Sequence, residues 1–365
     1  MRITFFLPSL AGGGAERMVL NLIQGLKSYP VQIDLVVTSS DGEWAEHIPG
    51  DTHLIDLKKG RVLLSLLPLI MVLRKNQPDI IFSAVDHANL IALLAAILSR
   101  TKAKRVISVH QVGSTFRQIH TGFRERIVHH CLRQFYRFAD QIVAVSSGVA
   151  EDLIQDAVID RQKLICIGNP IITEQQLDEM MNTPKEKDSR VFEIVSAGRL
   201  VKEKDFSTLL RAFSLVRQKV HCRLTIYGEG FERASLEKER DQLGLKDDVT
   251  FPGFSVNLFQ QFCRADLCVV SSLTEGFGNV IVESLACGVP VVATDCPGGP
   301  REILQQGQFG SLVPIQQPVI LAETILENMQ AVIDPVQLQE RARDFSIEKI
   351  SGLYYGLFKA LDEGK

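Results

Sequence analysis

Short apolar segments alternate with longer amphipathic stretches along the whole of this 365-residue chain. The short segments show little alternation of apolar and polar positions, which is the pattern of parallel strands covered on both faces. In the first half, strands are predicted at Ile3–Pro8, Ile33–Thr38, Asp79–Ser83, Arg105–His110, Gln141–Ser146 and Lys163–Ile167. The second half repeats the plan, with strands predicted at Phe192–Ala197, Arg223–Tyr227, Val249–Pro252, Leu267–Ser271, Val289–Thr294 and Ser311–Pro314.

The stretches between the predicted strands carry apolar residues at helical spacing. In the first half, helices are predicted at Ala15–Leu26, Val62–Lys75, Asn89–Ser99 and Phe123–Phe138. Strands that alternate with helices form parallel sheets with helices on both faces. The predicted fold class is therefore α/β, with two doubly wound Rossmann-like domains that face a cleft.

Polar and structure-breaking residues separate the two halves. Gly168-Asn169-Pro170 interrupts the pattern, and residues 182–189 are polar without apolar periodicity. We place the linker at about 170–190, the N-terminal domain at 1–170 and the C-terminal domain at 185–345. The stretch from Pro335 to Leu361 is predicted to be helical, and its last part, about 345–365, could pack back on the N-terminal domain.

Composition and charge exclude several classes of protein. The chain is 45% hydrophobic and 23% charged, as globular domains are, so a disordered, collagen-like or coiled-coil protein is excluded. The net charge of -3 gives no global sign of nucleic-acid binding. It hides an asymmetry, because residues 1–140 carry 17 Lys/Arg against 11 Asp/Glu and the remainder carries 23 against 32.

No signal for secretion or for a membrane span is present. The seven cysteines include no Cys-x-x-Cys pair, which argues against zinc or a disulfide framework and favours a reducing compartment. Met1–Phe6 has the pattern of a first strand and not of a secretory signal. The apolar run Val62–Leu73 contains Pro68 and is far shorter than the roughly 20 residues of a membrane span. We expect a cytoplasmic protein that is not integral to the membrane.

Glycines follow the first predicted strand. Gly12-Gly13-Gly14 precedes the first predicted helix, and glycines there let backbone N–H groups approach an anion. The spacing is not that of a dinucleotide fingerprint, and an ordinary tight turn would use the same residues.

Two cations follow the first strand of the second half. Arg199 and Lys204 come directly after Phe192–Ala197, and the carboxyl ends of parallel strands are where open α/β sheets bind ligands. Arginine and lysine together suit a diphosphate. A solvated charged loop would have the same composition, so this pair alone does not decide the function.

A glycine turn with two glutamates follows the strand Leu267–Ser271. Gly276 and Gly278 permit close approach to phosphate where the next helix begins, and Glu283 in that helix could accept both hydroxyls of a ribose. Glu275 and Glu283 are eight residues apart, a spacing that recurs at Glu229/Glu237 and Glu340/Glu348 on predicted surface helices. The context of strand, glycine turn and apolar helix therefore distinguishes the pair, and the spacing does not.

A histidine and a basic stretch in the first half are further candidates. His110 ends a predicted strand at its carboxyl edge, although isolated histidines are commonly structural. From Arg100 to Arg137 there are nine Lys/Arg against one acid, Glu125, with aromatic residues interleaved. Such a stretch can lie on an anionic membrane or be a surface helix with one buried face. Nucleic acid is the weaker interpretation, because no nucleic-acid-binding module accompanies the charge.

Together these residues resemble family 4 of the retaining glycosyltransferases, which have the two-domain GT-B fold. The resemblance covers about residues 1–305 and rests on these motifs: Gly-Gly-Gly-Ala-Glu-Arg at 12–17, Gly198-Arg199-Leu200 with Lys204, Tyr227-Gly228-Glu229-Gly230, Phe251-Pro252-Gly253, and Glu275-Gly276-Phe277-Gly278-Asn279 with Glu283. The segment 295–302, Asp-Cys-Pro-Gly-Gly-Pro-Arg-Glu, is similar to members that build bacterial surface polysaccharides on lipid carriers.

The resemblance implies roles for individual residues. Arg199 and Lys204 would bind the diphosphate and stabilise the leaving group. Glu283 would hold the ribose, and Gly228 would pack close to the nucleotide. The other implied contacts are Phe254 and Ser255 at the base, Glu275 and the backbone of Gly276, Phe277, Gly278 and Asn279 at the donor sugar and phosphates, Gly13 and Gly14 over the donor, and His110 at the donor sugar. Asp205 departs from the family, which often has glycine after the lysine.

The resemblance also implies the reaction. The expected enzyme is a retaining hexosyltransferase that moves a sugar from a UDP-sugar, with a UDP-N-acetylhexosamine as one candidate, to a polyprenyl-diphosphate-linked saccharide. Neither a glycosidase-type carboxylate pair nor an Asp-x-Asp motif is present, so we expect no enzymic nucleophile, metal or cofactor. The expected partners are the nucleotide-sugar donor, the lipid-linked acceptor and, through Arg117, Arg124 and Arg126, the anionic inner face of the cell membrane.

Two other functions stay open at this point. One is a UDP-sugar 2-epimerase on the same fold, and the other is a non-catalytic sugar-nucleotide-binding scaffold. The arginine-rich stretch argues against the epimerase, and intact Arg199, Lys204, Glu275 and Glu283 argue against the scaffold.

Overall fold

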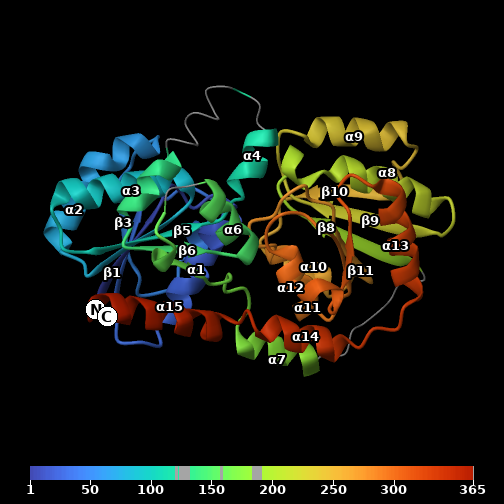
Figure 1. Ribbon diagram of the computed structural model, residues 1–365. Helices are drawn as coiled ribbons and strands as arrows, with labels where there is room; N and C mark the ends of the chain where they lie inside the picture. The colour runs from blue at the N-terminus through green and yellow to red at the C-terminus, as the bar shows by residue number, and fades with distance from the viewer. Residues whose placement is uncertain (120–121, 123–131, 157–158, 183–190, 365) are drawn as a thin grey trace. The chain divides into compact units, whose positions relative to one another are not determined.

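The chain forms two compact units in a computed structural model, which describes residues 1–119, 122, 132–156, 159–182 and 191–364 (Figure 1). Unit 1 comprises residues 1–170 and 347–365, and unit 2 comprises residues 171–346. Each unit is built around a parallel sheet with its own apolar core.

Unit 1 contains a seven-stranded sheet in the order β3-β2-β1-β4-β5-β6-β7. Its strands are β1 (Arg2–Leu7), β2 (Gln32–Val37), β3 (His53–Asp56), β4 (Ile80–Ala84), β5 (Lys104–Val109), β6 (Gln141–Ala144) and β7 (Leu164–Cys166). Every pair is parallel. The order reverses between β1 and β4, and that reversal is where doubly wound sheets bind ligands.

Helices cover both faces of this sheet. They are α1 (Gly14–Leu26), α2 (Leu66–Asn76), α3 (Asp86–Ser99), α4 (Gly113–Ile119), α6 (Ser147–Asp156) and α15 (Ile347–Asp362), with short helical turns η1 (Ala45–His47), η2 (Val62–Ser65), η3 (Phe135–Phe138) and η4 (Arg161–Lys163). The C-terminal helix α15 lies beside α1 (Figure 1). Tyr354 and Phe358 of α15 pack edge-on against Phe82 of β4, so the end of the chain completes the core of unit 1.

Unit 2 contains a six-stranded parallel sheet in the order β10-β9-β8-β11-β12-β13. Its strands are β8 (Phe192–Ala197), β9 (Cys222–Tyr227), β10 (Val249–Gly253), β11 (Leu267–Val270), β12 (Val291–Thr294) and β13 (Ser311–Val313). Its helices are α7 (Glu174–Asn182), α8 (Phe206–Arg217), α9 (Arg233–Gln242), α10 (Leu258–Phe262), α11 (Asn279–Ala286), α12 (Pro300–Ile303), α13 (Pro318–Gln330) and α14 (Pro335–Arg343), with turns η5 (Lys202–Lys204) and η6 (Gln305–Gly307). The strand order reverses between β8 and β11.

The prediction of two doubly wound α/β domains is confirmed, and the elements differ from the predicted ones in a few places. Strand β3 was not predicted, because it is short and lies at the edge of the sheet with Leu54 exposed. Helix α7 lies inside the predicted linker and buries Leu177, so unit 2 begins before residue 185. The predicted C-terminal helical stretch is two helices, α14 and α15, separated at residues 344–346.

Candidate functional site

The candidate residues of unit 2 follow successive strands along one edge of the sheet. Arg199 and Lys204 follow β8, Gly228 follows β9, Phe254 follows β10, and Glu275 follows β11. Because all these strands are parallel, their carboxyl ends meet at the same edge of the sheet. The residues after β8 and β11 flank the point where the strand order reverses.

Lys204 and Glu275 form an ion pair across this reversal point. Lys204 Nζ donates to Glu275 Oε1 at 2.5 Å, and their side chains are 21% and 10% exposed. The hydroxyl of Ser272 donates to the same carboxylate oxygen at 2.6 Å. Low exposure reduces the screening of the pair by solvent, so the ammonium is held firmly at the sheet edge.

The two loops that carry this pair are also joined through their backbones. The hydroxyl of Ser271 donates to the carbonyl of Lys204 at 2.9 Å, and the amide of Leu273 donates to the carbonyl of Glu203 at 2.8 Å. These contacts fix the position of Lys204 before any ligand arrives. The charges of Glu275 and Lys204 both act on the thiol of Cys296, but burial raises the pKa of this thiol to about 12, so it stays neutral.

Arg199 is a second cation at the same edge. Its side chain is exposed and makes no hydrogen bond or ion pair with any residue that the structure describes. The backbone of its segment is fixed, since Leu200 N–H donates to Glu229 and the carbonyl of Arg199 accepts from Val201 N–H at 2.8 Å. A planar guanidinium that has no such partner is suited to an anionic ligand.

Asp205 adopts a backbone conformation that glycine favours. Its φ of 44° and ψ of 47° lie in the left-handed region, which aspartate tolerates better than most residues. Its side chain accepts from the amide of Thr208 and from the Thr208 hydroxyl, the latter at 2.7 Å, so it caps helix α8. Aspartate at this position therefore permits the turn and also provides an N-cap.

Glycine is required after β9. Gly228 has a φ of +135°, and a Cβ there would lie 1.9 Å from the carbonyl oxygen of Gly198. The loop after β9 thus packs directly on the loop that precedes Arg199. The carbonyl of Gly253, at the end of β10, accepts from Gly228 N–H at 2.8 Å. Phe254, 37% exposed, and half-buried Ser255 follow immediately, so an exposed ring stands at the outer part of the same edge.

The glycine turn after β11 leads into helix α11. Gly278 caps the helix with a φ of 109°, and half-buried Gly276 and Asn279 lie on either side of the turn. The ring of Phe277 is 3% exposed and packs edge-on against Phe345 at 5.3 Å, so only its backbone is free to meet a ligand.

A second strand-like contact supports this turn. Glu275 forms a parallel bridge with Gly298, and a Cβ on Gly298 would lie 1.4 Å from the carbonyl oxygen of Glu275. The segment 295–302 singled out in the sequence is therefore the support on which the Glu275 turn rests. Only glycine permits so close an approach between the two backbones.

Glu283 lies in the second turn of α11 and is 1% exposed. It is far more buried than Arg199 or Lys204. Burial raises the pKa of the Cys268 thiol in strand β11, and the charge of Glu283 raises it further. Glu283 is therefore a buried carboxylate in the helix that begins at the glycine turn.

Unit 1 carries its candidate residues at the carboxyl edge of its own sheet. Gly13 caps helix α1, and a Cβ on it would lie 2.0 Å from Glu16 Oε2. Gly14 is exposed as the first residue of that helix. His110 follows β5 and shares a hydrogen bond of 2.9 Å with the hydroxyl of Ser108. Burial lowers the pKa of His110 to about 4 and the charge of Asp86 only partly opposes this, so the imidazole is neutral at pH 7.

Sequence reasoning missed a buried charged network beside His110. Arg133, one of the arginines of the basic stretch, is 1% exposed and donates to Asp152 Oδ2 at 2.6 Å. Asp152 also accepts from the amides of Gly113 and Ser114, at 2.8 and 3.0 Å. Arg133 Nη2 donates to the carbonyl of Gln111 at 3.1 Å. The network therefore fixes the loop that follows His110, and nothing in the sequence pairs Arg133 with Asp152 in advance.

The predicted membrane-contact residues lie mostly outside the described part of the chain. Arg117 is in helix α4 and is half-buried, whereas Arg124 and Arg126 fall outside the described residues. Among the residues that the structure describes, no helix has the length and apolar character to cross a bilayer, and no group of three or more His, Cys, Asp or Glu could hold a metal ion.

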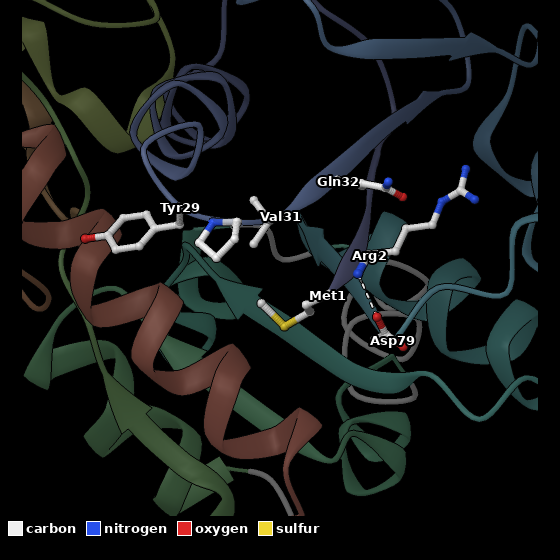
Figure 2. Close-up of a pocket in the computed structure, with 7 residues that line it drawn as sticks. Met1, Arg2, Tyr29, Val31, Gln32 and Asp79 are labelled. Carbon is white, nitrogen blue, oxygen red and sulfur yellow. Dashed lines mark hydrogen bonds between the residues drawn. The ribbon is translucent and has the colours of Figure 1, made fainter.

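A surface hollow of about 480 Å³ lies at the opposite edge of the unit 1 sheet. It is lined by residues at the amino ends of β1 and β2, and in Figure 2 the amide of Arg2 donates to Asp79. The side chain of Arg2 turns away toward Asp34, with which it forms an ion pair of 2.8 Å. This hollow includes none of the candidate residues.

Comparison with known proteins identifies the family. Residues 12–175 match the family model described as Glycosyltransferase Family 4, and residues 191–331 match the one described as Glycosyl transferases group 1. A Campylobacter jejuni protein is 30% identical over 324 residues, which are 86% of each chain. Its name is N-acetylgalactosamine-N,N'-diacetylbacillosaminyl-diphospho-undecaprenol 4-alpha-N-acetylgalactosaminyltransferase. The chain belongs to glycosyltransferase family 4.

Further relatives agree with this assignment. The lipopolysaccharide core biosynthesis glycosyltransferase LpsE of Rhizobium meliloti is 26% identical, with 94% of this chain and 95% of LpsE covered. The structure of Anabaena HepE in complex with UDP-glucose has a TM-score of 0.78 and 20% identity, over 99% of this chain and all of the other. The predicted GT-B class is confirmed. The names of the Campylobacter and Rhizobium relatives give the epimerase alternative no support.

Proposed function

We propose that this glycosyltransferase moves a sugar from a UDP-sugar, in the first instance a UDP-N-acetylhexosamine, to a polyprenyl-diphosphate-linked saccharide during the synthesis of a bacterial surface glycan. The observation that carries the proposal is the pair of cations at the edge of the unit 2 sheet: Lys204 held by Glu275, and Arg199 exposed beside the same strand. The names of the Campylobacter and Rhizobium relatives and the UDP-glucose complex of HepE support the choice of substrates.

In the proposed mechanism, unit 2 binds the donor. Arg199 and Lys204 bind the diphosphate, and their charge counters the negative charge that develops as the sugar leaves. The backbone of Gly276–Asn279 contacts the phosphates and donor sugar. Gly228 and the exposed ring of Phe254 accommodate the nucleoside, and Glu283 accepts from the ribose hydroxyls.

We infer that the anomeric configuration is retained without an enzymic nucleophile. The carboxylate that pairs with Lys204, Glu275, already accepts hydrogen bonds from Lys204 and Ser272 on a single oxygen. It is therefore suited to positioning the lysine and the donor sugar more than to attacking a sugar carbon. In this mechanism the leaving phosphate takes the proton of the acceptor hydroxyl, which attacks from the same face.

Unit 1 carries the residues proposed for the acceptor side and for the far side of the donor sugar. His110 is neutral at pH 7, so it can exchange a hydrogen bond with a sugar hydroxyl but does not contribute a positive charge. Gly13 and Gly14 are proposed to offer backbone N–H groups to the donor. A lipid-linked acceptor further implies that the enzyme works as a peripheral protein at the cytoplasmic face of the membrane.

The test is a donor screen followed by a transfer assay. The purified chain is incubated with each of a panel of UDP-, GDP- and ADP-sugars alone, and slow release of the nucleoside diphosphate is measured. We expect a UDP-sugar to give the fastest release, and that donor then to glycosylate a short-chain polyprenyl-diphosphate saccharide with retention, as read by NMR. Conversion of a UDP-sugar into an epimer would support the epimerase instead, and donor binding without turnover in either assay would support a scaffold.

A further inference from the structure

One helix of unit 1 is apolar on the side that faces solvent. Along η2 and α2, the side chains of Leu63, Leu64, Leu67 and Met71 are 70%, 58%, 72% and 71% exposed. Leu67 and Met71 are four residues apart in α2 and therefore lie in one row, and Leu63 and Leu64 of the preceding turn η2 come directly before them. We call these four residues the apolar face.

The opposite side of the same helix is already buried. Leu69, Ile70 and Leu73 pack into a core cluster with residues of β1, β2, β4 and α3. A surface helix normally directs apolar residues to the core and polar residues to water, and a helix that is apolar on all sides is normally buried. The apolar face is therefore not needed to hold the helix on unit 1, and it forms a contiguous exposed patch of the kind that marks an interaction site.

Basic residues border the apolar face at both ends. Between residues 57 and 78 there is no Asp or Glu, while Lys58, Lys59 and Arg61 precede the face and Arg74 and Lys75 follow it. Arg74 donates to the carbonyl of Leu98 at 3.1 Å, which brings the end of α3 alongside. There Ile97 and Leu98 are 40% and 50% exposed, so the end of α3 also presents apolar side chains to solvent.

The apolar face begins at the functional edge of the sheet. The hydroxyl of Ser65 donates to Thr38 Oγ1 at 2.9 Å, and Thr38 directly follows β2. Strand β2 is the neighbour of β1, whose carboxyl end leads into Gly13 and Gly14. The face therefore starts at the edge of unit 1 that carries its candidate residues.

We propose that the apolar face is a membrane-docking surface, whose leucines and methionine enter the interfacial region of an anionic bilayer while the bordering lysines and arginines contact lipid headgroups. Apolar side chains with a basic border, and with no acid between residues 57 and 78, are complementary to anionic lipid. A soluble protein partner would not need the uniform sign of charge. The proposal rests on the proposed function, because a lipid-linked acceptor gives the enzyme a reason to dock there.

Vesicle co-sedimentation of the full chain provides the first test. We expect binding to vesicles of phosphatidylglycerol and phosphatidylcholine, weaker binding to phosphatidylcholine alone, and a decrease with salt. Leu67→Ser with Met71→Ser should lower the partition coefficient by up to about a hundredfold, since each side chain of this size contributes about a factor of ten when it is fully buried. Arg61→Glu with Lys75→Glu should weaken binding to the anionic vesicles only.

Matched substitutions in unit 2 serve as controls. Val319 is 56% exposed and Val332 is fully exposed, so Val319→Ser with Val332→Ser removes comparable apolar surface elsewhere. Lys219→Glu with Lys246→Glu makes the same change of charge at exposed lysines of unit 2. Neither control should alter vesicle binding, and all variants should keep the wild-type rate of donor hydrolysis.

A tryptophan probe reports insertion without reference to activity. The chain has one tryptophan, Trp44, which is 7% exposed. In the Leu67→Trp variant, adding anionic vesicles should shift the tryptophan emission to shorter wavelength, and brominated lipid should quench it. The Val319→Trp variant should show neither the shift nor the quenching.

Three results would overturn the inference. One is unchanged vesicle binding after Leu67→Ser with Met71→Ser, combined with an unshifted Leu67→Trp emission. Another is loss of binding only in the Arg117→Glu, Arg124→Glu, Arg126→Glu variant, which would place docking on the basic stretch and leave the proposed function intact. The third is a dimer, seen by analytical ultracentrifugation, that the serine substitutions dissociate, because the face would then bind a second copy of the chain. Failure of the donor screen would refute the proposed function and leave these measurements unaffected.

Discussion

The coupling between Lys204 and Glu275 provides the sharpest test of the candidate site. The changes are Lys204→Ala, Glu275→Gln and the double variant. Lys204 Nζ lies 2.5 Å from Glu275 Oε1, and both side chains are largely shielded from water. If the ammonium stabilises the leaving diphosphate, losing this preorganised charge should lower kcat by about 10²–10³, which corresponds to roughly 2.7–4 kcal/mol of transition-state stabilisation.

Glu275→Gln keeps the shape of the side chain but removes the charge that holds the lysine. We expect it to lower kcat with little change in KM, because the ammonium loses its fixed position. When one group acts through the other, the effects do not add, and contacting residues typically couple by about 0.5–3 kcal/mol. The double variant should therefore be little worse than Lys204→Ala alone.

The assay is the initial rate of nucleoside diphosphate release at varied donor concentration, which separates kcat from KM. Arg211 and Glu239 provide a matched ion pair at 2.8 Å on the surface of the same unit, and Arg211→Ala with Glu239→Gln should change kcat less than about twofold. Near-full turnover of Lys204→Ala at saturating donor would refute the leaving-group assignment. Full additivity in the double variant would refute the idea that Glu275 acts through the lysine.

Further predictions concern single residues in both units. Arg199→Ala should lower kcat by about 10²–10³. Because the side chain is exposed, the melting temperature should stay within a degree or so of the wild-type value. A wild-type kcat would exclude a role for Arg199 at the diphosphate. Glu283→Ala should mainly raise KM for the donor, since hydrogen bonds to a ribose persist in ground and transition states, and an effect confined to kcat would contradict this. The pKa of His110 is lowered from 6.5 to about 4 in the folded state, so the unfolded chain binds the proton first as pH falls. The free energy of unfolding, measured by denaturant titration, should therefore decrease by up to about 3 kcal/mol between about pH 6.5 and 4. His110→Gln should make the free energy of unfolding depend less on pH in this range. Arg133→Met should destabilise unit 1 by about 3–5 kcal/mol, because it leaves the buried carboxylate of Asp152 without its charged partner. A decrease in the free energy of unfolding below about 1 kcal/mol in the same titrations would show that the pair is not structurally important.

The sequence by itself determined the architecture of both units. Buried parallel strands have to be apolar on both faces, so segments such as Phe192–Ala197 and Leu267–Val270 are recognisable without any knowledge of their neighbours. The motifs that follow these strands were equally visible. Since the carboxyl ends of parallel strands share one edge, their order along the chain was enough to predict that Arg199, Lys204 and Glu275 would gather there.

Edge elements and turns followed less directly from the pattern. Strand β3 has exposed residues and only four positions, so its sequence resembles a loop until β2 is present to pair with it. Asp205 shows the same dependence in a turn. Its left-handed conformation is stabilised by the cap that it provides for α8, and that contact exists only once the helix is in place.

Only the tertiary structure decided which charged and apolar residues are buried. Arg133 lies in a basic stretch and looked like a surface residue, yet it is buried because Asp152, on a different helix, neutralises it. Leu67 and Met71 looked like part of an ordinary amphipathic helix, yet they face water because Leu69, Ile70 and Leu73 already fill the contact with the sheet. Local pattern reports how apolar a residue is, whereas burial depends on partners that are distant in the sequence, and those partners are fixed only when the chain has folded.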